Sequence, residues 1–276
     1  IIAIGKGAYD ASDTENDNTA IGFNAMTTNT AGGTENVAVG NYALDALTSG
    51  DGNTAVGMNA LSANSTGGYN TAVGRGALIA NTTAQNNTAV GNYSLGANTT
   101  GASNVAMGHA ALDANTTASD NTALGTSALG ANTTGASNVA VGTRSMLTNT
   151  VAANNTSVGY ESLKVMTGTG DGRNTAIGFQ SGVALTTGNR NVFAGSVSGQ
   201  AVTTGDKNVL IGNNAGGSIT TVDDIVAIGA GALDSNTSGT LNTAVGTNAL
   251  ATNSTASGNV AVGHSAMLTG STAAYN

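Results

Sequence analysis

The chain repeats one short pattern of apolar and polar residues along its length. A core of the type Asn-Thr-Ala-Val-Gly ends in a glycine, here called the marker glycine, and occurs in 16 copies from Gly5 to Gly263. Successive marker glycines are 17 residues apart, except for one spacing of 18 and one of 19. A fixed short period is typical of repeat proteins whose units bury their apolar faces on one another. The pattern therefore predicts one elongated repeat domain over 1–276.

Alternation within the repeat predicts a first β-strand that ends at the marker glycine. Residues two apart share a face of a strand. The Thr or Val and the Val or Ile of the core should therefore point one way, and the Asn, Ala and Gly the other. The residue before the marker glycine is apolar in every copy, so we assign this column to the core. It includes Val39, Val56, Val73 and Val90.

A second apolar column lies four residues after the marker glycine and includes Leu44, Leu61, Leu78 and Leu95. We interpret it as a second strand that meets the first across a narrow interior. A helix is a poor alternative, because glycine and β-branched residues occur in every unit. The predicted fold is all-β, a parallel β-solenoid (β-roll) of 16 coils of about 17 residues with two short strands each.

Two polar columns carry information about the backbone. The marker glycines, such as Gly40, Gly57, Gly74 and Gly91, indicate a positive φ or a close backbone approach at a turn. An Asn stands four residues before the marker in 14 of 16 copies, and examples are Asn36, Asn53, Asn70 and Asn87. Stacked Asn side chains can form hydrogen-bonded ladders. A ladder is the preferred interpretation, and a ligand-binding Asn row is the alternative.

The alanine two residues before the marker glycine is predicted to face outward. This column includes Ala38, Ala55, Ala72 and Ala89. A row of methyl groups permits close approach of another sheet, whereas simple solvent exposure would need no partner. Because only 8% of the residues are charged, we favour a subunit contact.

The repeats fall into four stretches: regular repeats over 1–167, a spacer over 168–173, variant repeats over 174–224 and regular repeats over 225–276. In the variant repeats the leucine column becomes Gly182, Gly199 and Gly216, and large residues appear three positions later as Leu185, Val202 and Ile219. Phe193 and Leu210 replace the alanine that is predicted to face outward. The core residue has therefore moved within the unit, which predicts a different cross-section there.

Composition excludes several classes of protein. The chain contains no Cys, which rules out disulfides and thiolate metal sites, and its net charge of −8 argues against nucleic-acid binding. No apolar run approaches the roughly 20 residues of a membrane helix, so no membrane span is expected in this segment. The sequence begins and ends within a repeat, which we interpret as a piece of a longer fibre protein.

Residues that could carry chemistry are few. His109 and His264 both follow a marker glycine, nine repeats apart, and are interpreted as surface residues, although a ring of equivalent histidines in a trimer is an alternative. The acidic cluster in Asp10–Asp17 could bind calcium, but its spacing does not follow an EF-hand, so a solvated turn is preferred. No Ser has a neighbouring His and carboxylate, and no glycine-rich loop precedes a helix. We expect no enzyme, no cofactor and no metal.

The Asn-Val-Ala-Val-Gly and Asn-Thr-Ala-Ile-Gly cores resemble the head repeats of trimeric autotransporter adhesins of the YadA type. The longer phrase Asn-Thr-Ala-Val-Gly-x-x-Ala-Leu, with its Asn-Thr-Thr spacers, resembles shaft repeats of phage tail fibres and bacterial surface fibres, many of which end in an endosialidase-type chaperone domain. The resemblance covers essentially the whole chain. It implies a left-handed roll, three chains around one axis and a structural or adhesive role, and it carries over no catalytic residues.

The predicted function is therefore a segment of an extracellular trimeric fibre, either a phage tail fibre (a virion component) or a bacterial surface adhesin. It would project a receptor-binding tip that lies outside this segment. The alternative is a monomeric solenoid that binds ice or glycan along one flat face. Against ice, the threonine three residues before the marker glycine is interrupted by valines and is predicted to be buried.

Overall fold

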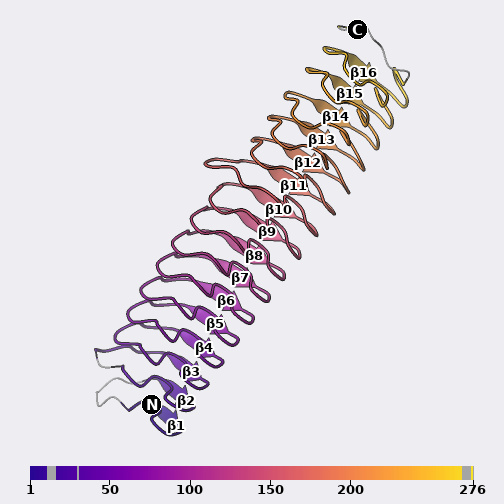
Figure 1. Cartoon of the computed structure of the whole chain (residues 1–276). Helices are drawn as coiled ribbons and strands as arrows, with labels where there is room; N and C mark the ends of the chain where they lie inside the picture. The colour runs from indigo at the N-terminus through magenta and orange to yellow at the C-terminus, as the bar shows by residue number, and fades with distance from the viewer. Residues whose placement is uncertain (11–16, 30, 269–274, 276) are drawn as a thin grey trace. The chain divides into compact units, whose positions relative to one another are not determined.

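The computed structural model describes residues 1–10, 17–29, 31–268 and 275, which fall into two compact units, 1–137 and 138–276. Each unit is a parallel β-solenoid in which one short strand per coil is followed by a series of turns (Figure 1). The strands of the first unit are β1 (Ile2–Ile4), β2 (Thr19–Ile21), β3 (Val37–Val39), β4 (Thr54–Val56), β5 (Thr71–Val73), β6 (Thr88–Val90), β7 (Val105–Met107) and β8 (Thr122–Leu124). Those of the second unit are β9 (Val139–Val141), β10 (Thr156–Val158), β11 (Thr175–Ile177), β12 (Val192–Ala194), β13 (Val209–Ile211), β14 (Val226–Ile228), β15 (Thr243–Val245) and β16 (Val260–Val262).

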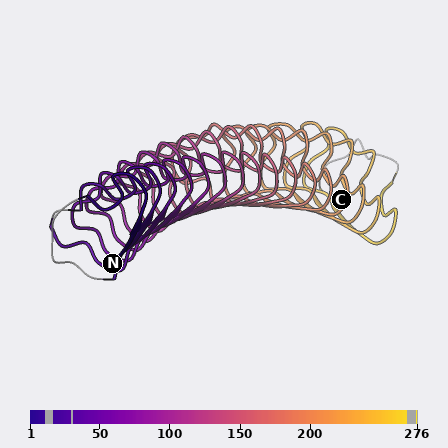
Figure 2. The ribbon, with the colours of Figure 1, turned by 90° about the horizontal axis from the view of Figure 1, so that it is seen from below.

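Strand register follows the sequence period. Within each unit a strand pairs in parallel with the next strand along the chain, and equivalent positions face each other, as Ala55 faces Ala72 between β4 and β5. Successive coils of a unit therefore lie side by side, which the turned view shows (Figure 2). The predicted all-β parallel solenoid with coils of about 17 residues is confirmed. Among the residues that the structure describes, there is no helix long and apolar enough to cross a membrane.

The predicted second strand is wrong, because the segment after the marker glycine consists of turns. In the coil of β6, Tyr93 and Leu95 both have a φ of 52°. Left-handed residues at alternate positions curl the backbone, whereas a strand needs an extended φ. The leucine side chains nevertheless point into the coil, and the predicted core residues Leu44, Leu61, Leu78 and Leu95 are all fully buried.

The predicted facing of the strand is also wrong. The alanines in its middle, assigned to a subunit contact, are fully buried inside their own chain: Ala38, Ala55, Ala72 and Ala89. The valines assigned to the core lie on the outside, with Val39, Val56 and Val90 half-buried and Val73 37% exposed. The physical reason is space. A buried leucine enters the narrow interior from the turns, so the strand can add only a methyl group opposite it.

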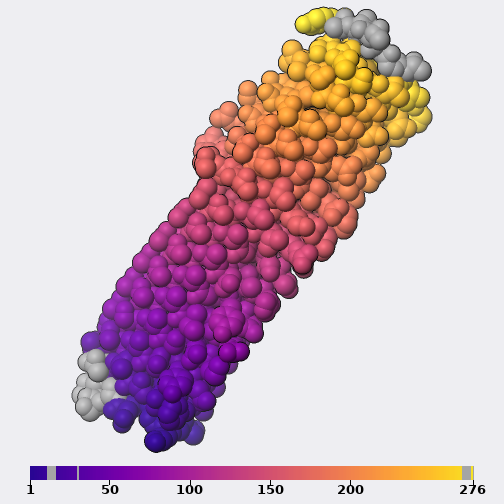
Figure 3. Space-filling view, viewed as in Figure 1, coloured from indigo at the N-terminus to yellow at the C-terminus, as the bar shows by residue number. Residues whose placement is uncertain are grey.

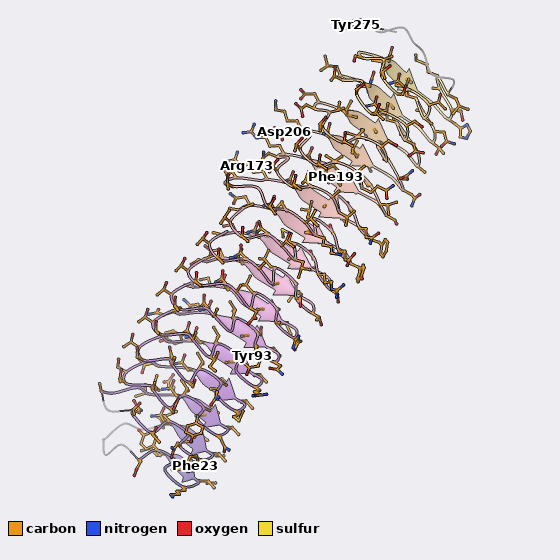
Figure 4. The ribbon with its side chains drawn as sticks, viewed as in Figure 1. Phe23, Tyr93, Arg173, Phe193, Asp206 and Tyr275 are labelled. Carbon is orange, nitrogen blue, oxygen red and sulfur yellow. The ribbon has the colours of Figure 1, made fainter. Side chains whose placement is uncertain are left out.

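In the variant repeats the interior is equally narrow, but the large side chain comes from the strand and the glycine from the turns. A Cβ atom at Gly182 would lie 2.5 Å from Cδ2 of Phe193, and one at Gly199 would lie 2.7 Å from Cδ1 of Phe193. The Phe193 ring thus occupies the volume that leucines fill elsewhere, and it is fully buried within its coil (Figure 4). Leu210 likewise fills the space opposite Gly216, because a Cβ atom at Gly216 would lie 2.8 Å from Cδ1 of Leu210.

The spacer 168–173 protrudes at the edge of the second unit, next to the place where Arg173 is labelled (Figures 3 and 4). It returns to the coils through a parallel bridge between Ala153 and Asp171. Asp171 accepts hydrogen bonds from the Asn154 amide and from Nη2 of Arg173, the latter at 2.5 Å. These two hydrogen bonds hold the pKa of the exposed Asp171 carboxyl below its usual range.

Candidate functional site

One candidate surface is formed by the first and third residues of the strands, and we call it the outer strand face. Its first column is Thr or Val, with Ile2 in β1, and its third column is Val, Ile, Leu, Met or Ala; no residue in either column is charged. Parallel in-register pairing stacks these side chains in two straight rows within each unit. The outer strand face of each isolated unit is thus an apolar stripe with threonine hydroxyls along one row.

The other side of the strand belongs to the interior, where its Asn residues form the predicted ladder. Asn70 donates its backbone N–H to Oδ1 of Asn53 at 3.1 Å and its side-chain Nδ2 to Ala84 O at 2.8 Å. Asn87 in turn donates its backbone N–H to Oδ1 of Asn70 at 3.0 Å. Asn36 extends the row by accepting from the N–H of Asn53 at 2.8 Å. The row is fully buried, so no ligand can reach these side chains.

A second Asn ladder, which the sequence interpretation missed, runs through the first unit seven residues after the marker glycine. Its buried members are Asn64, Asn81, Asn98, Asn115 and Asn132. Nδ2 of Asn81 donates to Oδ1 of Asn64 at 2.9 Å, and Nδ2 of Asn98 donates to Oδ1 of Asn81 at 3.1 Å. The signal was present in the Asn of the Asn-Thr-Thr spacers, which composition alone assigned to a turn. Both ladders satisfy buried backbone groups at the corners of the coil.

The marker glycines sit where consecutive backbones approach most closely. Gly40, Gly57, Gly74 and Gly91 have φ between 136° and 141°. A Cβ atom at any of them would lie 2.4–2.5 Å from the carbonyl oxygen of the next marker glycine. Both proposed reasons for a glycine at this turn, a positive φ and a close approach, therefore apply.

The histidines and carboxylates do not converge on a chemical site in the part of the chain that the structure describes. His109 and His264 are both exposed. No group of three or more His, Cys, Asp or Glu residues close enough for a metal ion occurs among the described residues. Of the acidic cluster, Asp10 and Asp17 are described, whereas Asp13 and Glu15 lie outside the described residues.

One charged network is centred on Glu161. Glu161 accepts hydrogen bonds from Nζ of Lys164 at 2.8 Å, Nε2 of Gln180 at 3.1 Å and Nη1 of Arg144 at 3.5 Å. The Lys164 ammonium, followed by the Gln180 amide, lowers the pKa of the Glu161 carboxyl to about 2. Glu161 is therefore ionised at neutral pH, and the two cations beside it leave no net negative charge at this corner.

Exposed aromatic residues gather at the corner just after the marker glycine. The rings of Phe23 and Tyr42 contact each other edge to face. The guanidinium carbon of Arg75 lies 5.6 Å from the centroid of the Tyr93 ring. Phe23 and Tyr93 are labelled in Figure 4. In the second unit Tyr160 and Phe179 are stacked, with ring centroids 5.6 Å apart and planes 11° apart. The corner carries these rings in single coils or pairs, separated by coils that have no aromatic residue there.

Comparisons with protein-family models, with curated proteins and with solved structures found no match to this chain.

Proposed function

We propose that this chain is a structural segment of an extracellular fibre in which three copies pack side by side through their outer strand faces. The single observation that carries this proposal is the apolar stripe on the outside of each unit. Eight strands at about 4.8 Å spacing and roughly 10 Å width give an area near 400 Å² per unit. The largest exposed apolar patch on an ordinary soluble monomer covers roughly 300–600 Å² and is often an interaction surface, so a stripe of this size supports a contact.

A second and third copy of the same chain are the partners that fit this face best. The face repeats with the coil spacing, so an identical face can match it along its length. Neither column contains a charge that would be desolvated on contact. The interior of each coil is closed by its Asn ladders and buried leucines, so the outer strand face supplies the attachment and the stacked coils supply the stiffness. In such a fibre, the segment would hold a receptor-binding tip away from its anchor.

Paired lysine substitutions test this assembly. Val56 and Val90 lie on the outer strand face two coils apart, and a lysine at each site would place an uncompensated charge in the contact. At micromolar concentration we expect the wild-type protein to form a particle of three times the chain mass of 26.5 kDa. The Val56→Lys, Val90→Lys variant should have the mass of a single chain. Light scattering after size-exclusion chromatography measures both.

A matched control uses two exposed threonines in the turns that precede a ladder Asn, also two coils apart. Thr66→Lys, Thr100→Lys adds the same charge away from the outer strand face, and it should keep the wild-type mass. A monomeric wild-type chain, or equal dissociation of both lysine pairs, would contradict assembly through this face.

A second candidate, ice binding, is favoured by one observation. The threonine column, predicted to be buried, faces outward at Thr54, Thr71 and Thr88 and stacks in register with its neighbours. A flat outward row of hydroxyl and methyl groups is the surface that ice binding requires. Faceted ice crystals grown in a solution of monomeric chain would favour this candidate over the fibre.

A further inference from the structure

The surface of the second unit steps down sharply between the coils of β11 and β12. On one coil Ile177 and Phe179 flank the marker glycine, and on the next Ala194 and Ser196 occupy the same two positions. Because the second pair is small, Ile177 is 47% exposed and Phe179 is 50% exposed. We call Tyr160, Phe179 and Ser196 the aromatic step.

The Phe179 ring at this step is held in place. Tyr160, at the same position of the preceding coil, stacks on it with planes 11° apart and covers one ring face. Backbone hydrogen bonds from Gln180 N to Tyr160 O at 2.9 Å and from Val197 N to Phe179 O at 2.8 Å fix the corner on both sides. The opposite ring face points toward the coil of Ser196, where no bulky side chain covers it.

Uncharged polar residues lie on the two coils beyond that open ring face. Ser196 is exposed, and Nδ2 of Asn213, from the coil beyond, lies 3.4 Å from the backbone oxygen of Ser196. The Gln180 amide reaches away from this face to Glu161 in the Tyr160 coil, where Lys164 and Arg144 balance the carboxylate charge. The step therefore combines one flat aromatic face with hydroxyl and amide groups at its edge.

We propose that the aromatic step binds the pyranose ring of a neutral sugar. The C–H groups on one face of a pyranose carry a slight positive charge, which complements the negative face of an aromatic ring. One coil spacing is about 4.8 Å, which matches the thickness of a sugar ring lying flat on Phe179 above Ser196. The hydroxyls at the ring edge would then reach Ser196 and Asn213. This assignment does not rest on the assembly proposed above.

Saturation-transfer-difference NMR of the full chain with methyl β-D-glucopyranoside, methyl β-D-galactopyranoside and methyl α-D-mannopyranoside, each at millimolar concentration, tests this site. We expect at least one of the three to receive saturation on its ring protons. Phe179→Ala removes the stacking face and should abolish the signal. Ser196→Phe covers the open face of Phe179 with an aromatic ring, as the two preceding coils already carry at this position, and it should abolish the signal as well.

Tyr93→Ala is the matched control, because it removes an exposed aromatic ring in a distant coil, and it should leave the signal unchanged. Circular dichroism should show the same folded spectrum for all variants. The assignment is overturned if none of the three glycosides receives saturation from the wild-type chain, or if the signal survives Phe179→Ala. It is also overturned if Phe179→Ala lowers the mass of the assembly while no glycoside binds, since the step would then be a contact between copies. A chain that is monomeric and still binds sugar would contradict the fibre proposal alone.

Discussion

Replacing the marker glycine Gly91 with alanine should lower the free energy of unfolding by about 3–5 kcal/mol, which is at the extreme of single substitutions. Gly91 has a φ of 136°, a conformation that residues with a side chain rarely adopt. Its new Cβ would also lie 2.4 Å from the carbonyl oxygen of Gly108 and 2.7 Å from its carbon. Both atoms belong to the backbone, so relief requires the two coils to separate.

Urea unfolding followed by circular dichroism measures this loss, and amide hydrogen exchange locates it. We expect faster exchange in the coils of β6 and β7 than in the wild-type chain. Gly130→Ala is the matched control, since a Cβ there would come no closer than 3.3 Å to another residue. An alanine at Gly130 should be neutral or slightly stabilising, because it restricts the unfolded chain. Equal urea midpoints for Gly91→Ala and Gly130→Ala would show that the close approach of the marker glycines does not restrict which residues fit there.

The second large effect is expected at the buried Asn ladder. Asn70→Ala removes the acceptor of the Asn87 N–H and the donor to Ala84 O, at 3.0 and 2.8 Å. An unsatisfied buried donor or acceptor costs about 1–3 kcal/mol, and a cavity adds to it, so we expect a loss of about 2–4 kcal/mol. Urea unfolding of Asn70→Ala beside the exposed-site control Thr83→Ala measures this difference.

A leucine at the same site separates hydrogen bonding from volume. Asn70→Leu fills the space but offers neither donor nor acceptor, so it should destabilise the chain about as much as alanine does. Ile225 is fully buried at the corresponding position of the β14 coil, so the position accepts an apolar side chain of this volume, and a loss in Asn70→Leu reports the missing hydrogen bonds. Wild-type stability of Asn70→Leu would contradict a structural role for the ladder and leave only packing.

The sequence period predicted the solenoid well because the same columns recur at nearly constant spacing. Leu95, Asn87 and Gly91 occupy the places expected of them, in the core, the ladder and the tight turn. Such columns are informative because each residue packs against the equivalent residue of the next coil. The same limit on residue type therefore applies in every coil. The outward placement of threonine and valine could not be obtained from hydrophobicity, because it depends on the width of the coil.

The strand faces could have been assigned correctly from one change in the sequence. Where the leucine column becomes Gly182, Gly199 and Gly216, the alanine column becomes Phe193 and Leu210. Opposite changes in size indicate contact, so alanine and leucine had to share the interior. The turn that replaces the second strand left no comparable signal. Leu95 adopts a φ of 52°, which costs a non-glycine residue about 1–2 kcal/mol and is sustained by burial of its side chain.

The most direct test of the account compares two neighbouring residues of β6 as single cysteines in a chain that has none. Val90→Cys lies on the outer strand face and Ala89→Cys in the interior. Native samples treated with a short bismaleimide should give covalent dimers for Val90→Cys, while Ala89→Cys stays unlinked and unreactive until urea is added. Covalent dimers from Ala89→Cys in the native state would contradict the strand facing. Reaction of Val90→Cys without joining copies would contradict assembly through the outer strand face.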